Sequence, residues 1–394
     1  MIGEERPRAS PSLREVAAYF LQLGALGFGG PVALASAMRR DLVDRRGWLT
    51  EAEYDSGLAI AAACPGPLAY QLGVYAGFLR HGLAGGLAVA VAFGLVPFLL
   101  VVAVAALYTR LADAWALRAV FYGVGPVVVA LIVKGCWTLG RRTLRRGAVA
   151  WTLAAVAAVV TAVVEKELTV LFLAAGMIGI AVFAPAAPAP VRPEPAKPPP
   201  PTASGAAVPL VLAAALPPGT AGQLFLFFFK TGCLVFGSGL VIVPFLKTYV
   251  VDQYQWMGNR EFLDAVAIGM ISPGPVVITA TFVGYRVAGL AGAAAATLGI
   301  FSPAVLFTVT ATPLLLRHGS NRRLQGFVRG VTVSVVGVLA GTTLLVARPA
   351  IGDPLTAAIA LASLAVLAAP WKVPEPFVVL AGALIGLGTR APAG

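Results

Sequence analysis

The chain has 394 residues, of which 59% are apolar and only 12% are charged. A soluble protein is typically about 45–50% apolar and about 25% charged, so this composition excludes an ordinary soluble domain and predicts an integral membrane protein. There are 29 basic and 17 acidic residues, and the basic ones fall mostly in short gaps between apolar runs. This distribution is typical of the positive-inside rule and argues against nucleic-acid binding.

The apolar stretches form two sets of six, and most reach the roughly 20 residues that a membrane-crossing helix needs. We therefore expect an all-α polytopic membrane protein with about ten to twelve membrane segments. The stretches cover 16–37, 56–79, 83–109, 117–137, 147–164 and 168–184, then 223–246, 262–285, 289–315, 327–347, 350–370 and 374–388.

A segment rich in proline and alanine separates the two sets. It includes four consecutive prolines, Pro198 to Pro201, and such a composition is typical of a semi-rigid extended linker. The sequence thus predicts an N-terminal repeat at 1–184, a linker at 185–219 and a C-terminal repeat at 220–394.

The two halves carry the same spaced motifs, which indicates an internal duplication. Asp44, Trp48 and Glu53 recur as Asp252, Trp256 and Glu261, each 208 positions later. The basic loops swap between equivalent positions: 141–146 is arginine-rich in the first half, whereas 317–329 is arginine-rich in the second. By the positive-inside rule this swap predicts inverted repeats with a cytoplasmic linker.

Each half contains a Pro-Gly-Pro motif inside an apolar stretch. Proline removes a backbone donor and clashes with the preceding helical turn, and freed backbone groups in a membrane must be satisfied by protein or a watery cavity. We expect a broken or re-entrant helix at each motif, whose resuming helix offers N-terminal amides to an anion; the alternative is a kink that only shapes the bundle. The candidate binding residues are Pro65, Gly66, Pro67 and Gln71, with Ser272, Pro273, Gly274 and Pro275 in the second half.

A second matched pair of breaks is rich in glycine. Glycine permits either close helix packing or an unwound backbone that contacts a ligand, and both interpretations stay open. The candidate residues are Phe28, Gly29, Gly30 and Pro31 in the first half and Gly237 and Ser238 in the second.

Charged residues near these motifs are further candidates, because charges inside apolar runs are costly and often functional. Lys230 can balance a bound anion or extend to the membrane interface. Arg39 and Arg40 are also candidates to balance a bound anion, or they belong to a basic cytoplasmic loop. Glu53 and Glu261 can carry a proton, or they are carboxylates of a helix first turn. Asp55 and Asp264 border the same motifs.

No pattern predicts a metal site, a cofactor site or an enzyme. The three cysteines, Cys64, Cys136 and Cys233, are too widely spaced for a zinc motif. No G-x-x-x-x-G-K-[ST] segment is present to hold nucleotide phosphates. We therefore expect no metal, no cofactor and no catalytic residue, and regard a membrane-embedded enzyme or a scaffold as less favoured alternatives.

Taken together, the motifs resemble the chromate ion transporter family of bacteria and archaea in its long-chain, two-domain form. They are Phe28-Gly29-Gly30-Pro31, Trp48-Leu49-Thr50, Pro65-Gly66-Pro67 with Gln71, and Gly82-Leu83-Ala84-Gly85-Gly86. The second half departs from the pattern, since Phe236-Gly237-Ser238-Gly239 lacks the proline and Ser272 replaces Cys64.

The resemblance implies a secondary transporter of the cell inner (cytoplasmic) membrane that exports chromate, driven by the membrane potential or a proton gradient, and confers chromate resistance. Transport of sulfate or another oxyanion is the alternative. The expected partners are the oxyanion and membrane lipid. The sequence leaves the oligomeric state open, and a homodimer is one possibility.

Overall fold

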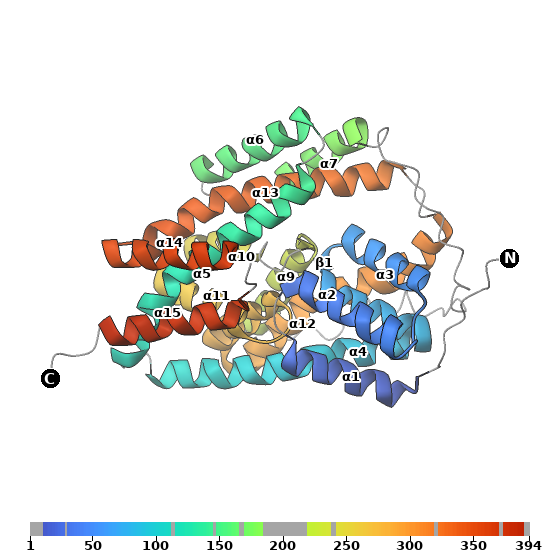
Figure 1. The fold of residues 1–394 in the computed structure, drawn as a ribbon, viewed down its shortest axis with the longest axis horizontal. Coiled ribbons are helices and arrows are strands. Elements are labelled where there is room, and N and C mark those ends of the chain that lie inside the picture. The colour runs from blue at the N-terminus through green and yellow to red at the C-terminus, as the bar shows by residue number, and fades with distance from the viewer. Residues whose placement is uncertain are drawn as a thin grey trace. The chain divides into compact units, whose positions relative to one another are not determined.

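The structure is a computed structural model in which the described part of the chain is almost entirely helical (Figure 1). It describes residues 11–27, 30–111, 115–144, 147–164, 169–183, 219–237, 242–318, 322–369 and 373–389. The predicted linker at 185–219 lies outside these residues except for Gly219. Phe28, Gly29 and Ser238 lie outside them as well.

The first repeat contains α1 (Leu13–Leu26), α2 (Gly30–Met38), the π-helix η1 (Arg39–Arg45), α3 (Glu51–Ala63), β1 (Gly66–Pro67), α4 (Leu68–Leu111), α5 (Trp115–Thr143), α6 (Ala148–Val164) and α7 (Thr169–Phe183). The second contains α9 (Thr220–Gly232), β2 (Phe236–Gly237), α10 (Ile242–Leu246), the π-helix η4 (Lys247–Gln253), α11 (Asn259–Ile271), the 3-10 helix η5 (Val276–Ile278), α12 (Thr279–His318), α13 (Arg322–Ala350), α14 (Pro354–Ala368) and α15 (Glu375–Thr389).

The two repeats share unusual local geometry at equivalent positions. The π-helices η1 and η4 begin and end 208 positions apart. After η1 the Trp48 amide donates to the Leu42 carbonyl at 2.7 Å, and after η4 the Trp256 amide donates to the Val250 carbonyl at 2.8 Å. π-Helical turns are rare, so their recurrence supports the duplication that the sequence predicts.

The helices α4 and α12 each fold back on themselves at a glycine. Gly82 and Gly289 both have φ +60 and ψ −148, a conformation that non-glycine residues seldom adopt. The helical parts on either side then pack tightly: a Cβ on Gly77 would lie 2.4 Å from the Gly85 carbonyl oxygen, and one on Gly284 would lie 2.2 Å from that of Gly292. Each long helix is therefore a helical hairpin.

The predicted helix breaks at the two Pro-Gly-Pro motifs are confirmed. The helix α3 ends at Ala63 and α4 begins at Leu68, whereas α11 ends at Ile271 and α12 begins at Thr279. Cys64 (φ −97, ψ 150) and Ser272 (φ −60, ψ 139) cap the ending helices with an extended backbone. Both residues precede a proline, whose ring disfavours the helical conformation of its neighbour.

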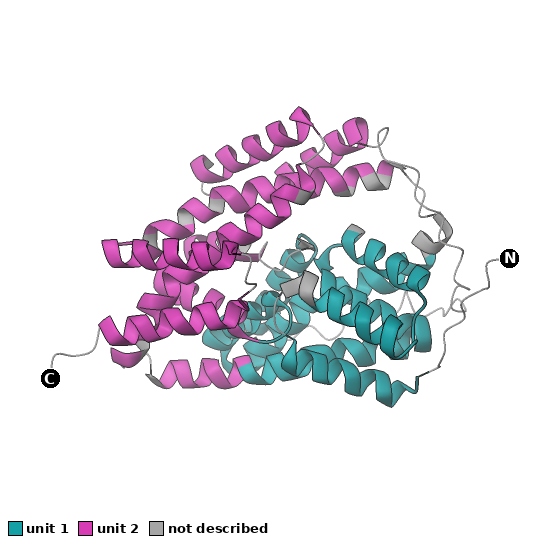
Figure 2. Cartoon of the chain, in the orientation of Figure 1, with its two compact units in different colours: residues 1–100, 188–239, 273–321 teal, residues 101–187, 240–272, 322–394 magenta. Residues whose placement is uncertain are grey.

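The chain divides into two compact units, and each unit takes segments from both repeats (Figure 2). Unit 1 comprises residues 1–100, 188–239 and 273–321, and in it α12 packs against α9 and α3. Unit 2 comprises residues 101–187, 240–272 and 322–394, and in it α13 packs against α5, α6 and α7. The helices α11, α14 and α15 also pack against α5 in unit 2.

By length and composition, four helical segments of the described chain could cross a membrane: Leu68–Arg110, Arg118–Arg141, Val276–Pro313 and Arg329–Arg348. The first and third of these contain the folds of α4 and α12 at Gly82 and Gly289. Shorter apolar helices cover Ala148–Val163, Leu171–Phe183, Pro354–Ala368 and Glu375–Thr389. The protein is a multi-pass membrane protein, and the count of ten to twelve segments stays a prediction.

Candidate functional site

The two Pro-Gly-Pro breaks are held by reciprocal backbone hydrogen bonds between the repeats, all within unit 1. The Gly66 amide donates to the Val235 carbonyl at 2.5 Å, and the Gly274 amide donates to the Gly27 carbonyl at 2.9 Å. Gly274 lies 208 positions after Gly66, and Val235 lies 208 positions after Gly27. Such reciprocity is what a two-fold relation between the repeats produces, and it fits the inverted arrangement that the loop charges predict.

The first of these contacts extends into a short parallel pairing of β1 with β2. Gly66 pairs with Phe236, and Pro67 pairs with Gly237. The first Pro-Gly-Pro motif therefore lies against the glycine-rich break of the other repeat, which brings together two motifs that the sequence predicted separately. The amides of Gly66 and Gly274 are both used inside the protein, so an anion bound here needs other donors.

The first Pro-Gly-Pro motif is the tip of a helical hairpin. A Cβ on Gly57 of α3 would lie 2.3 Å from the Tyr75 ring of α4. Tyr75 also packs with Ile60 and Cys64, which end the same helix. These contacts join positions about equally far before and after Gly66, so α3 and the start of α4 run back along each other.

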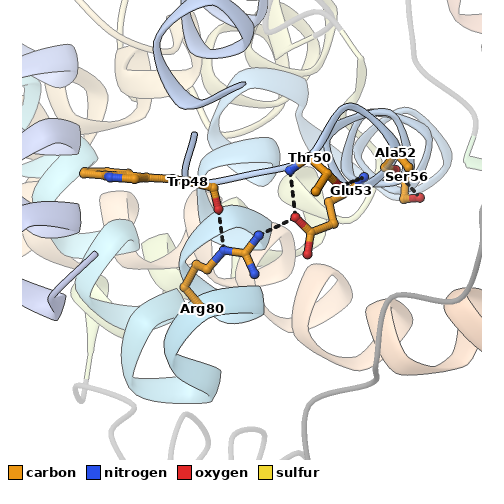
Figure 3. Close-up of polar contacts among 6 residues, drawn as sticks. All are labelled: Trp48, Thr50, Ala52, Glu53, Ser56 and Arg80. Carbon is orange, nitrogen blue, oxygen red and sulfur yellow. Dashed lines mark hydrogen bonds and ion pairs between the residues drawn. The ribbon is translucent and has the colours of Figure 1, made fainter. Parts of the chain in front are cut away.

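At the open end of this hairpin an ion pair joins the two helices (Figure 3). The Arg80 guanidinium pairs with the Glu53 carboxylate, and its Nε donates to the Trp48 carbonyl at 2.6 Å. The side chains of Arg80 and Glu53 are only 16% and 15% exposed. The Thr50 amide also donates to Glu53 Oε2 at 2.8 Å, within the capping box that begins α3. Glu53 is thus a helix-start carboxylate with a cationic partner.

Three buried polar atoms of unit 1 have no hydrogen-bond partner in the described structure: Gln71 Oε1, Tyr75 Oη and Thr308 Oγ1. All three side chains are fully buried. Gln71 and Tyr75 are one turn apart on α4, just after the break. Phe307 and Ala311 of α12, the helix that carries Thr308, pack against the cluster that contains Tyr75. A buried polar group without a partner is costly, so each of these atoms is a candidate to hydrogen-bond a polar ligand or a water molecule.

Gln71 is anchored to the break by its amide nitrogen, which donates to the Pro65 carbonyl at 2.8 Å. Its counterpart Thr279 donates instead to the Val276 carbonyl at 2.9 Å. A Cβ on Gly66 (φ +140) would lie 2.7 Å from Gln71 Cδ. The glycine of the motif is therefore required both by its backbone conformation and by the close approach of Gln71.

The other candidate residues from the sequence lie at several different places in the fold. Ser272 and Pro273 are buried beside the second break, as is Pro275. Gly30 and Pro31 begin α2. Lys230 is exposed in the last turn of α9, and Glu261 lies in the first turn of α11.

The two basic candidates after the first glycine-rich break are exposed. Arg39 Nε donates to Glu51 Oε1 at 3.0 Å, and Arg40 lies 3.9 Å from an Asp41 oxygen. Neither contact brings these arginines to the Pro-Gly-Pro motifs.

Sequence reasoning missed Arg80, Tyr75 and Thr308. Tyr75 lies inside the apolar stretch 56–79 and Arg80 directly follows it, so only the contacts of the folded hairpin distinguish them from their neighbours. Thr308 is one of several threonines in α12. The helical spacing of Gln71 and Tyr75, four residues apart after the break, was the available signal. Among the described residues, no group of three histidine, cysteine or acidic side chains is placed to hold a metal ion.

Comparison with known proteins gives a consistent family. The Chromate transporter family model matches residues 14–180 and again 222–387. A chromate transport protein of Cupriavidus metallidurans is 42% identical over 380 residues, covering 95% of this chain and 93% of the relative. A probable chromate transport protein of Synechococcus elongatus is 41% identical over 95% of both chains.

A third relative, a chromate transport protein of Pseudomonas aeruginosa, is 33% identical over 86% of this chain and 82% of its own. No solved structure matches the chain significantly. With both repeats matched by one family model and relatives above 40% identity over nearly the full length, the chain belongs to the chromate transporter family.

Proposed function

We propose that the protein exports chromate across the cytoplasmic membrane as a secondary transporter and thereby confers chromate resistance. The observation that carries the proposal is the reciprocal pairing of the two broken segments, Gly66 with Val235 and Gly274 with Gly27. Non-helical backbone at membrane depth is tolerated where it is buried in protein or lines a cavity, and transporters place substrate sites at such discontinuous helices.

Two buried hydroxyl groups on α4 and α12 suit a tetrahedral dianion. Chromate has four oxygens that accept hydrogen bonds, and the Tyr75 and Thr308 hydroxyls are buried donors without a partner among the described residues. Gln71 holds the Pro65 carbonyl of the break in place. We assign the two hydroxyls as substrate donors and Gln71 as the residue that fixes the break.

The helical hairpin formed by α3 and the start of α4 is the proposed re-entrant element. Its ends are joined by the Arg80–Glu53 pair and its tip is the Pro-Gly-Pro motif. A hairpin that enters and leaves at one membrane face puts the polar ends in the interface and the tip near the midplane, where the substrate crosses.

The membrane potential is a sufficient energy source for this export. Moving one charge across 100 mV is worth about 2.3 kcal/mol, so a dianion leaving a negative interior gains about twice that amount. Export therefore needs no coupled ion, although a proton gradient can add to it.

Uptake of radioactive chromate into everted membrane vesicles tests the proposal, because the inner face of the membrane then faces the medium. We expect accumulation that stops when the electrical gradient is collapsed and that excess sulfate inhibits weakly. Accumulation that ignores both the electrical and the pH gradient would overturn the secondary-transport mechanism. Inhibition by an equal concentration of sulfate would favour the general oxyanion carrier instead. Vesicles with the Gly66→Ala variant serve as the matched negative control.

A further inference from the structure

Unit 2 contains a cavity of about 670 Å³ whose lining residues all belong to this unit. The first turns of α5 and α11 line it, together with the loop between α13 and α14 and the start of α14. Its ionisable lining residues are Arg118, Tyr122, Arg260, Asp264 and Asp353. The cavity is large enough for a hydrated oxyanion.

Asp264 is the most buried acid of this lining, at 4% exposure. Tyr108, near the end of α4, donates its hydroxyl hydrogen to Asp264 Oδ2 at 2.7 Å. Burial raises the pKa of the Asp264 carboxyl to about 7, and it outweighs the hydrogen bond from Tyr108 and the charge of Arg260, which both lower the pKa. Although Asp264 falls in the apolar stretch 262–285, the helix α11 that carries it is not one of the described helices long and apolar enough to cross a membrane.

Asp353 differs from Asp264 in its environment. It accepts a hydrogen bond from the Tyr122 hydroxyl at 2.6 Å and one from the Thr356 amide at 2.8 Å. The hydrogen bond from Tyr122, followed by those from the α14 backbone, holds the pKa of Asp353 below its usual range. Asp353 therefore stays ionised at neutral pH, and Asp264 is the acid of the lining that changes charge there.

Protonation of Asp264 changes the net charge of the cavity lining. Two exposed arginines, Arg118 and Arg260, and the two carboxyls of Asp264 and Asp353 belong to the lining. With both carboxyls ionised the lining is neutral, and with a proton on Asp264 it carries one net positive charge. Elsewhere on the helices packed against α11, Lys134 pairs with Glu375 and Lys247 pairs with Asp252. Glu261 lies in the first turn of α11 itself, and Arg348 lies in the last turn of α13.

We propose that this cavity binds a divalent oxyanion and that binding is linked to protonation of Asp264. The inference rests on the proposed function only for the class of ligand. It gives the two repeats different tasks, because 208 positions before Asp264 stands Ser56, whose hydroxyl donates to the Ala52 carbonyl at 2.7 Å, and 207 positions after Tyr108 stands Leu315. The acid and its tyrosine are thus present in one repeat alone.

Sulfate binding to the purified full-length protein at about pH 6 and pH 8 tests the proposal by titration calorimetry. Sulfate suits the test because it stays a dianion over this range, whereas chromate itself takes up a proton. If only the protonated form binds, the apparent affinity falls about tenfold from pH 6 to pH 8, in proportion to the protonated fraction.

The variant Asp264→Asn keeps the size of the side chain and is permanently uncharged, so we expect its affinity to be equal at both pH values. Tyr108→Phe removes a hydrogen bond that stabilises the ionised carboxyl, and it should move the loss of binding to a higher pH. Arg260→Gln should weaken binding at both pH values. The matched control Asp44→Asn, at an exposed position outside the cavity, should keep the wild-type pH dependence.

Three outcomes would overturn the inference: sulfate that binds at neither pH, a wild-type affinity that does not change with pH, and Asp264→Asn that keeps the wild-type dependence. If the pH dependence of sulfate affinity is lost in Glu261→Gln but retained in Asp264→Asn, the linked proton binds Glu261, and the inference is overturned. Chromate export in vesicles is measured separately. A protein that exports chromate without pH-linked sulfate binding refutes this inference alone, and the reverse result refutes only the proposed function.

Discussion

Gly66 donates its amide hydrogen to the carbonyl oxygen of Val235, a residue of the other repeat. The backbone amide freed by the helix break of the first repeat is thereby satisfied by a carbonyl of the second repeat. Together with the equivalent bond from Gly274 to Gly27, this contact lets two Pro-Gly-Pro interruptions exist in a membrane protein without leaving their central amides unsatisfied.

Replacing Gly66 with alanine should therefore abolish transport and lower thermal stability. Gly66 has φ +140, and an added Cβ would lie 2.7 Å from both the Ala304 Cβ and the Gln71 Cδ. Gly82 is the control, since it has φ +60 and open space around it. Gly82→Ala should cost about 1–3 kcal/mol, from backbone strain alone, because its φ +60 and ψ −148 favour glycine. Equal losses of transport and melting temperature in the two variants would refute the special role of Gly66.

Removing the two unpartnered hydroxyls should separate function from stability. Tyr75→Phe and Thr308→Val delete buried polar atoms that have no protein partner in the described structure, so the folded state should be unchanged or slightly more stable. Chromate transport should fall at least tenfold in each, since a substrate oxygen loses its donor. The measurements are vesicle uptake and a melting curve in detergent. Variants with full transport would show that these hydroxyls do not contact substrate.

The Arg80–Glu53 pair should be a stabilising clamp of the hairpin. Arg80→Met leaves the Glu53 carboxylate and the Trp48 carbonyl without their partner, which should cost about 2 kcal/mol. Because the two side chains act as a pair, the double variant Arg80→Met with Glu53→Gln should lose less than the sum of the single variants. The double-mutant cycle is read from melting temperatures. Strict additivity would contradict a direct interaction.

The raised pKa of Asp264 also predicts how stability changes with pH. The ordinary value is 3.8 and the folded value is about 7, so the unfolded chain releases this proton first as the pH rises. Between these two pH values Asp264 therefore makes the folded state less stable with increasing pH, by up to about 1.4 kcal/mol per pH unit.

Asp264→Asn removes this dependence. The stability of the variant minus that of the wild type should therefore be larger at pH 8 than at pH 5. Functional groups often lower stability in this way. Melting curves of both proteins across this range provide the test, with Asp44→Asn as the control. A stability difference that does not grow with pH would contradict the buried, protonated carboxyl.

Much of the architecture was predictable from the sequence because it depends on local rules. Proline forces the preceding residue to be extended, so the ends of α3 and α11 at Ala63 and Ile271 follow from the two motifs. The repeat was visible because Trp, Asp and Glu recur at a fixed offset. The hairpins at Gly82 and Gly289 were less visible, because a positive φ does not show in a sequence.

The contacts of the site were not predictable, because they join segments that are far apart in the chain. Nothing in the motif around Pro65 indicates that its glycine pairs with Val235. The same limit applies to the acids: Glu53 and Asp264 both border a motif in the sequence, yet Glu53 has an arginine partner and Asp264 is buried beside a tyrosine. Only the packing of α4 and α5 distinguishes the two.

The most direct test of the central claim is chromate flux in proteoliposomes under an imposed potassium diffusion potential, with no pH gradient. We predict that chromate moves toward the positive side, that the flux reverses when the potential is reversed, and that Gly66→Ala abolishes it while Gly82→Ala retains it. A flux that is absent in the wild type, or that persists unchanged in Gly66→Ala, would contradict chromate transport through the paired breaks.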